Sequence, residues 1–268
     1  DDQKELPSLL QSEVVQQLVL NKVMQARSSV VMAPDFPTVQ QMEQQLCAEI
    51  ELRERTVGSL SPELLKSMYL LLRLYKVWHS HSPADTLVKA ERLIGRLMAI
   101  AETDEARFAA VFVNCGVFWN HTGHDDKAMP LYERAVRLDS QALTDRAHMD
   151  NALIAMNNLG KLHSDQGRYA QAQSLYERVL NLRSKMLAES HPDVLVSINN
   201  LACVHHLQKR YDQALPLYER ALRLHEQTFG EHHPAVATSL SNLAALYKDL
   251  KRLDKALPLA ERALRIRE

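Results

Sequence analysis

Apolar residues along much of the chain recur at the spacing of one α-helix face, and the helical segments come in pairs. One segment has the i, i+3, i+4, i+7 spacing at Ile198, Leu201, Ala202 and His205. In the next segment Ala214, Tyr218 and Ala221 lie at steps of four and three, which also places them on one face. The polar run 208–210 separates the two segments. This pattern predicts pairs of amphipathic helices joined by short polar turns.

The paired pattern repeats with a period near 42 residues. A Leu-Tyr-Glu-Arg type of motif occurs four times, beginning at Leu131, Leu175, Leu217 and Leu259. Two other motifs keep the same step, namely Asn158-Leu159, Asn200-Leu201 and Asn242-Leu243, and His191-Pro192 and His233-Pro234. Three independent motifs with one period indicate a repeat array. Proline suits the start of each first helix, because the amide there has no partner within the helix.

The small number of glycines agrees with a helical array. The 268 residues include 7 Gly and 10 Pro, whereas a doubly wound α/β fold or a β-sandwich needs many glycine-rich turns. Gly116 and Gly160 are expected where first helices pack closely, and Gly123 and Gly167 in turns. Later repeats replace these four with Ala202 and Ala244, and with Lys209 and Lys251.

The order of large, small and aromatic residues resembles the tetratricopeptide repeat. The matching residues of one unit are Ile198, Leu201, Ala202, His205, Ala214, Tyr218 and Ala221, and the other units begin at Phe112, Met156 and Leu240. The 42-residue form is similar to that of kinesin light chains and nephrocystin-3. The resemblance implies an all-α fold, a right-handed α-α superhelix of antiparallel helix pairs. It also implies that the first helices line the concave face.

The repeat predicts how the chain is divided. Residues 104–268 are expected to form four repeats, at 104–146, 147–190, 191–232 and 233–268. Residues 62–103 are expected to form a degenerate repeat, because Glu91-Arg92 precedes Glu133-Arg134 by one period. Residues 1–61 are then divergent N-terminal helices or a capping repeat.

Two N-terminal helices are expected, over 7–28 and 37–58, with a loop from Ser28 to Phe36. The first residue is not Met, and the last falls within a helical pattern, so we expect a piece of a larger protein.

Charge and cysteine content exclude several classes of function. The net charge is -1 without a basic block, which argues against nucleic-acid binding. The longest apolar run, at 69–72, is far too short to insert into a membrane, and no signal peptide is visible. Three scattered cysteines, Cys47, Cys115 and Cys203, favour a reducing compartment and a cytoplasmic location.

No pattern of catalytic residues or metal ligands is recognisable, so we expect neither an enzyme nor a cofactor. The histidines at 79, 81, 205 and 206 lack partners at metal-ligand spacing. His163 and His205 occupy the repeat position of Trp119 and Tyr247, which indicates packed core residues. Asp126, in the sequence His-Asp-Asp, is expected to cap a helix N-terminus.

Asparagines recur at one position of the first helices. The resemblance implies that they face the groove and bind the backbone of a peptide, which suits an amide that both donates and accepts. The predicted groove residues are Asn114, Asn157, Asn158, Lys161, Asn199, Asn200, His206, Asn242 and Lys248. The alternative is that these asparagines bridge neighbouring repeats or bond the local backbone.

The sequence therefore predicts a monomeric, non-catalytic scaffold that binds a peptide or helix of a partner protein in its groove. The positions used by chaperone-tail binders hold Ala110, Val113, Val117 and Thr238, so a partly apolar peptide is favoured instead. One alternative is a structural or self-associating arm, and another is the sensor arm of a larger STAND-type ATPase. Residues 1–36 could also fold across the groove and inhibit it.

Overall fold

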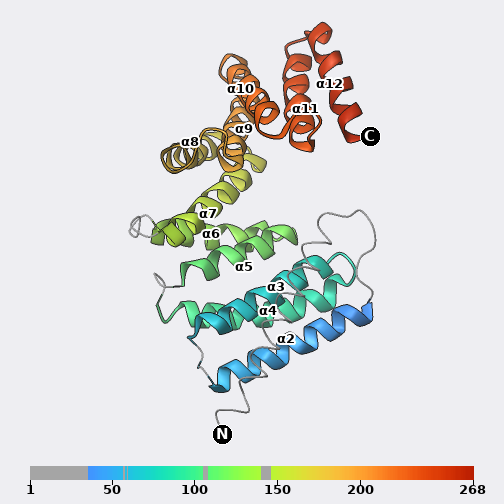
Figure 1. Cartoon of the computed structure of the whole chain (residues 1–268). Coiled ribbons are helices and arrows are strands. Elements are labelled where there is room, and N and C mark those ends of the chain that lie inside the picture. Colours follow the sequence, from blue (N-terminus) through green and yellow to red (C-terminus); the bar gives the residue numbers. More distant parts are fainter. Residues whose placement is uncertain (1–35, 57, 59, 105–107, 140–145) are drawn as a thin grey trace. The chain divides into compact units, whose positions relative to one another are not determined.

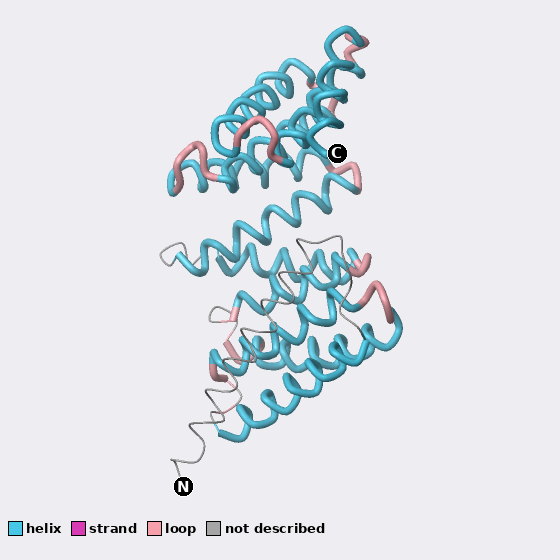
Figure 2. Tube along the Cα trace, turned by 45° about the vertical axis from the view of Figure 1, so that its right-hand side comes forward, coloured by secondary structure: helices cyan, strands magenta, loops and turns pink. Residues whose placement is uncertain are grey.

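The structure is a computed structural model that describes residues 36–56, 58, 60–104, 108–139 and 146–268. These residues form helices joined by turns and contain no strand (Figures 1 and 2). The helices are α2 (Phe36–Thr56), α3 (Pro62–Trp78), α4 (Pro83–Ala101), α5 (Ala109–His121), α6 (Asp125–Asp139), α7 (Arg146–Asp165), α8 (Tyr169–Met186), α9 (Pro192–Leu207), α10 (Tyr211–Phe229), α11 (Pro234–Asp249) and α12 (Leu253–Arg267). The predicted all-α solenoid of antiparallel helix pairs is confirmed.

The chain divides into two compact units, 1–152 and 153–268, and the boundary falls within α7. We call them unit 1 and unit 2 and describe each by itself. The helix expected over 37–58 is α2. The helix expected over 7–28, the loop before Phe36 and the inhibitory segment lie outside the described residues, and the repeat boundaries stay a prediction.

The first helices begin at proline with a side-chain cap before it. His191 Nδ1 accepts a hydrogen bond from the amide of Asp193 at 3.2 Å, and His233 does the same for Ala235 at 3.1 Å. Each cap supplies a partner for an amide that the helix itself leaves without one. The expectation that His-Pro opens a first helix is therefore confirmed. The cap expected at Asp126 is wrong, because α6 already begins at Asp125.

The turn between two helices of a pair uses the left-handed region of backbone conformation. Gly123 and Gly167 have φ values of 80° and 75°, and Lys209 and Lys251 occupy the same place with φ of 60° and 59°. Glycine adopts this conformation without strain because it has no Cβ atom, whereas lysine adopts it at a cost. The predicted placement of these glycines in turns is confirmed.

The contact between the two helices of a pair is closest where a tyrosine of the second helix lies over a small residue of the first. A Cβ atom added to Gly116 would lie 2.7 Å from Cε1 of Tyr132, and one added to Gly160 would lie 2.9 Å from Cε1 of Tyr176. Tyr132 is completely buried. Glycine thus allows the close approach, as the sequence predicted.

Successive pairs are linked by a polar contact that recurs at one repeat position. In unit 2, Arg183 Nη1 donates to Ser197 Oγ at 2.9 Å, and His225 Nδ1 lies 2.8 Å from Ser239 Oγ. In both cases the partners are fourteen residues apart and connect the end of a second helix to the first turns of the next first helix. We call this contact the serine link.

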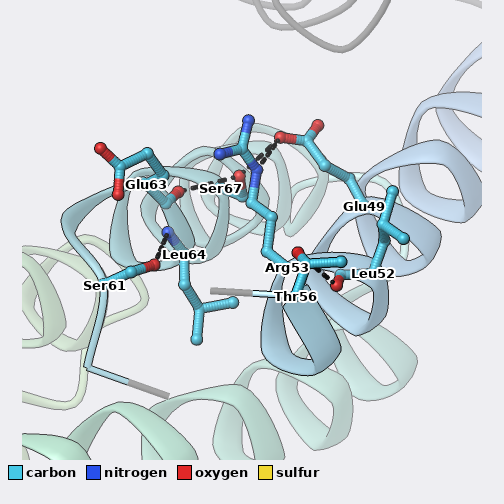
Figure 3. Close-up of polar contacts among 8 residues, drawn as sticks. All are labelled: Glu49, Leu52, Arg53, Thr56, Ser61, Glu63, Leu64 and Ser67. Atoms are coloured by element: carbon cyan, nitrogen blue, oxygen red, sulfur yellow. Dashed lines mark hydrogen bonds and ion pairs between the residues drawn. The ribbon is translucent and has the colours of Figure 1, made fainter. Parts of the chain in front are cut away.

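Unit 1 has the same link with a buried ion pair added (Figure 3). Ser67 Oγ donates to Glu49 Oε1 at 2.8 Å, and Arg53 Nε donates to the same oxygen at 2.8 Å. Between α4 and α5 the equivalent positions hold Leu97 and Val111, and both are completely buried. The link is therefore polar on both sides or apolar on both sides, as expected where an unpartnered polar group would be costly.

Candidate peptide-binding surface

One face of the first helices in unit 2 is left uncovered by the rest of the unit. On α9 and α11 it consists of the repeat asparagine and the positions four before, one before, three after and seven after it. Asparagine positions are half-buried and the others are mostly exposed. We call it the first-helix face, and its residues include Ile154, Asn157, Asn158, Lys161, Val196, Asn199, Asn200, Cys203, Leu207, Thr238, Ser241, Asn242 and Ala245.

Asparagine side chains connect the first helices into a ladder along this face. Asn200 Nδ2 donates to Asn157 Oδ1 at 2.8 Å, and Asn242 Nδ2 donates to Asn199 Oδ1 at 2.9 Å. Each bond joins residues 43 positions apart, so the face is continuous across α7, α9 and α11. These are the bridges between repeats that the sequence left open as an alternative to peptide binding.

The charged residues predicted for the groove lie beside the ladder and form ion pairs. Lys161 Nζ lies 2.8 Å from Asp165 Oδ2 on its own helix, with both side chains exposed. His206 Nε2 lies 2.9 Å from Asp249 Oδ2 on the next first helix. Lys248 is exposed near the C-terminal end of α11. The charges around the ladder are thus mixed in sign.

Exposed aliphatic side chains alternate with the asparagines. Ile154 is 42% exposed, and Val196 and Leu207 are each 45% exposed. The sequence analysis expected apolar positions around the ladder but did not single out these three. Their spacing of four before and seven after the asparagine could have identified them, since both steps keep to one helix face.

Asn114, the remaining predicted asparagine, lies in unit 1 and has a different environment. Its Nδ2 donates to the carbonyl oxygen of Ala110 at 2.8 Å, which is a bond within α5. The residue lines a pocket of about 580 Å³ between α3 and α5, together with Tyr69, Leu72, Arg73, Lys76, Val77, Val117, Phe118 and His121. Burial raises the pKa of Tyr69, so its phenol keeps its proton. The α3 residues were missed because the repeat motif has decayed there.

The histidines of the chain serve packing and local contacts. His163 and His205 are buried, and burial, together with the nearby Arg210, lowers the pKa of His205. His81 stacks on Trp78 with ring centroids 4.8 Å apart. Over the described residues we find no group of three or more His, Cys, Asp and Glu side chains that could hold a metal ion.

The cysteines and helices bear on the environment of the protein. All three cysteines are free thiols, and burial raises the pKa of Cys115 to about 12. Cys203, in contrast, is exposed on the first-helix face. In the described part of the chain, no helix combines the length and the apolar character that a membrane span requires.

Comparisons with solved structures give the same fold. BtubC (BKLC) from P. vanneervenii superimposes with a TM-score of 0.70 at 21% identity, covering 85% of this chain and 91% of that one. A kinesin light chain-like protein of Podosopora anserina with nearly identical TPR-like repeats gives a TM-score of 0.63 at 23% identity, covering 77% and 96%. A STAND protein of Pyrococcus horikoshii with a tetratricopeptide repeat sensor gives 0.64 at 14% identity, covering 95% of this chain and 36% of that one. At these identities the likeness concerns the fold.

A relative and a family model match the sequence itself. The uncharacterized protein ycf37 of Porphyra purpurea is 29% identical over 87 residues, which make up 32% of this chain and 44% of that protein. The chain thus spans less than half the length of this relative. The model of the tetratricopeptide repeat matches residues 107–185, 151–227 and 193–268, which together exceed half of the chain. With its helix pairs, its tyrosine-on-glycine contacts and this match, the chain belongs to the tetratricopeptide repeat family.

Proposed function

We propose that the protein is a non-catalytic scaffold that binds an extended segment of a partner protein across the first-helix face of unit 2. One observation carries the proposal. The asparagine ladder runs across three first helices, and exposed aliphatic side chains stand beside it. A surface that combines amide groups and apolar side chains suits a peptide that needs both.

The asparagines are suited to bind the peptide backbone. A side-chain amide has two N–H donors and a carbonyl oxygen. The ladder uses one N–H of Asn200, so its oxygen and second N–H remain for a peptide group. The ladder also fixes the amide's orientation before binding, which lowers the entropic cost of association. Bridging the repeats and binding a peptide are therefore compatible roles for the same side chain.

The aliphatic residues are suited to contact the side chains of the peptide. Ile154 and Val196 lie at the same position of successive repeats, four residues before the asparagine. Lys161 is already paired with Asp165, so a charged peptide would have to compete with that pair. The favoured ligand is thus an extended segment with apolar side chains at intervals. The pocket beside Asn114 is proposed as a separate binding site of unit 1.

The test is a peptide-array pulldown with variants of the whole chain. Asn158→Ala, Asn200→Ala and Asn242→Ala should each weaken binding, and Val196→Glu should weaken it about tenfold or more by placing a charge at an apolar contact. The matched control is Val88→Glu in unit 1, because Val88 is also exposed, at 62%. If the asparagine variants lower thermal stability while every partner still binds, the ladder is structural only.

Cys203 offers a second readout on the native protein. Its thiol is exposed on the face, whereas Cys115 is buried. A bound peptide should slow alkylation of Cys203 and leave the other two cysteines unchanged. Alkylation at the same rate with saturating peptide would place the peptide elsewhere.

We also propose a monomeric, cytoplasmic protein with repeats divided at residues 104, 147, 191 and 233. The free thiols support a reducing compartment. Sedimentation analysis at two concentrations tests the monomer.

A further inference from the structure

A second surface of unit 2, away from the ladder, is apolar and open. A groove of about 680 Å³ lies along α11 and α12, with alanines as its floor and leucines at its sides. Leu253, Leu257 and Leu264 are exposed by 64%, 63% and 58%. Ser241, Lys248 and Arg267 form its polar rim. We call this surface the end face.

The repeat shows what covers the same surface elsewhere in unit 2. One period before Leu253, Leu257 and Leu264 are Tyr211, Leu215 and Leu222. These three are half-buried, because they pack against residues of α11, the first helix of the following pair. One period earlier again, Tyr169 and Leu180 pack against α9 in the same way. In both cases the occupant is an amphipathic first helix.

The two covering helices have one pattern in common. Residues of α9 at the contact are Val194, Ile198, Leu201 and Val204, and those of α11 are Val236, Leu240, Leu243 and Leu246. Both sets follow the spacing i, i+4, i+7, i+10. A helix with small floor residues beneath it and this apolar stripe can approach closely, as α9 and α11 do.

The rim adds a requirement for charge. His206 on α9 pairs with Asp249 on the helix that covers it, at 2.9 Å. Lys248 stands at the equivalent place on the end face, one period after His206. An acidic residue thirteen positions after the first apolar residue, as Asp249 is after Val236, would lie opposite Lys248.

The charge of the end face also decides between occupants. Residues 248–268 carry seven Lys or Arg and four Asp or Glu. Two copies meeting at this surface would bring their basic rims together, which is unfavourable. An acidic helix has no such penalty.

We propose that the end face docks an amphipathic helix of a second protein, which has apolar residues at i, i+4, i+7 and i+10 and an acidic residue at i+13. The helix takes the place that a further first helix would occupy. This surface is distinct from the ladder, so the proposal does not depend on the peptide-binding function.

The probe for the test is a fluorescent peptide with the sequence of residues 233–250, which carries this pattern. It is stapled between positions 238 and 245, both exposed in α11, because an isolated short helix is marginal in water. The whole chain should bind it saturably. Leu257→Glu in the chain should weaken binding by at least about 30-fold, since it removes an apolar contact and buries a charge. Leu257 is exposed, so the variant should fold, and its circular dichroism melt checks this.

Two controls isolate the end face. Leu207→Glu changes an exposed leucine on the first-helix face and should leave binding unchanged. A peptide with Asp249→Lys should bind about threefold more weakly, as expected for an exposed ion pair. The chain variant Lys248→Glu should restore its binding, because the charges are then reversed on both sides.

Three outcomes would overturn the proposal. The first is the absence of saturable binding of the peptide. The second is a dimer of the whole chain that Leu257→Glu dissociates, because the occupant is then a second copy. The third is tighter binding of a peptide with the sequence of residues 7–28, because the occupant is then a segment of this chain.

Discussion

The two units are built from the same helix pairs but present different first-helix faces. In unit 2 the asparagines bond from helix to helix and form the ladder. In α3 of unit 1, counted from the first proline of the helix, Tyr69 stands in the place of Asn199 and Leu70 in that of Asn200. Without amides on α3 no ladder can form there, and a pocket lined by aromatic and basic residues lies between α3 and α5 instead.

The same contrast holds for the contacts between successive pairs. Unit 1 uses a buried ion pair at one serine link and two apolar residues at the equivalent place further on. Unit 2 uses Arg183 at one link and His225 at the next. The comparison teaches that the repeat fixes where a contact is needed and leaves its chemistry open, provided that both sides match.

The largest effect is expected at the ion pair of unit 1. Glu49→Leu leaves the buried Arg53 without its carboxylate, which should lower the free energy of unfolding by about 3–5 kcal/mol. Urea denaturation measures the loss. The double variant with Arg53→Leu should recover much of it, because the uncompensated charge is then gone. A loss below about 1 kcal/mol in the single variant would contradict this account of the link.

The next effect is expected at the close contact of α5 and α6. Gly116→Ala places a Cβ atom against Tyr132, so unit 1 should lose about 1–3 kcal/mol in thermal or urea unfolding. Ala202 takes the same position in unit 2 beside the buried Tyr218. Ala202→Gly should cost about 1 kcal/mol through helix propensity alone. Stabilisation by Gly116→Ala would mean that the tyrosine ring yields.

A smaller effect should depend on pH and come from unit 2. Burial lowers the pKa of His225, with His233 adding to the shift, so the unfolded chain binds its proton more readily than the folded one. Stability is then full above the unfolded pKa of about 6.5 and falls with decreasing pH, by at most about 1.4 kcal/mol per unit. Urea unfolding between pH 8 and 5 measures the slope. His225→Gln should flatten it, leaving the part due to His205.

The smallest effect is expected in the turns. Lys209→Gly should raise the free energy of unfolding by about 0.5–1 kcal/mol, because glycine adopts the positive φ without strain. The reverse change in unit 1, Gly123→Lys, should lose a similar amount. Thermal unfolding of both variants gives the comparison, and a loss with Lys209→Gly would show that the lysine side chain contributes more than the strain costs.

Much of the fold could be predicted from local patterns. Apolar periodicity predicted the helix pairs, His-Pro predicted the starts of α9 and α11, and the glycines predicted the turns and the close contacts. These features succeed because each depends on the residue's own backbone geometry or on one helix face. The prediction for Asp126 failed because helix boundaries shift by a residue or two without changing the periodic pattern.

The candidate site was predictable in part. The asparagine positions were visible in the sequence, but their partners were not, since Asn157 and Asn200 are 43 residues apart and meet only when the pairs stack. Likewise, the period alone did not reveal that Ile154 and Leu207 are exposed while Leu201 is buried. The pocket of unit 1 was missed because it depends on α3, where the motif has decayed.

The sequence by itself determined the repeat, the family resemblance and the residues at each repeat position, because they follow from spacing along one chain. Only the tertiary structure decided which of these residues touch and which remain open. Glu49 and Ser67 share a hydrogen bond, and Asn199 bonds Asn242, because stacked helices bring distant positions within 3 Å. The leucines of α12 are apolar in sequence like those of α10, and the absence of a neighbouring helix in the described structure leaves them exposed.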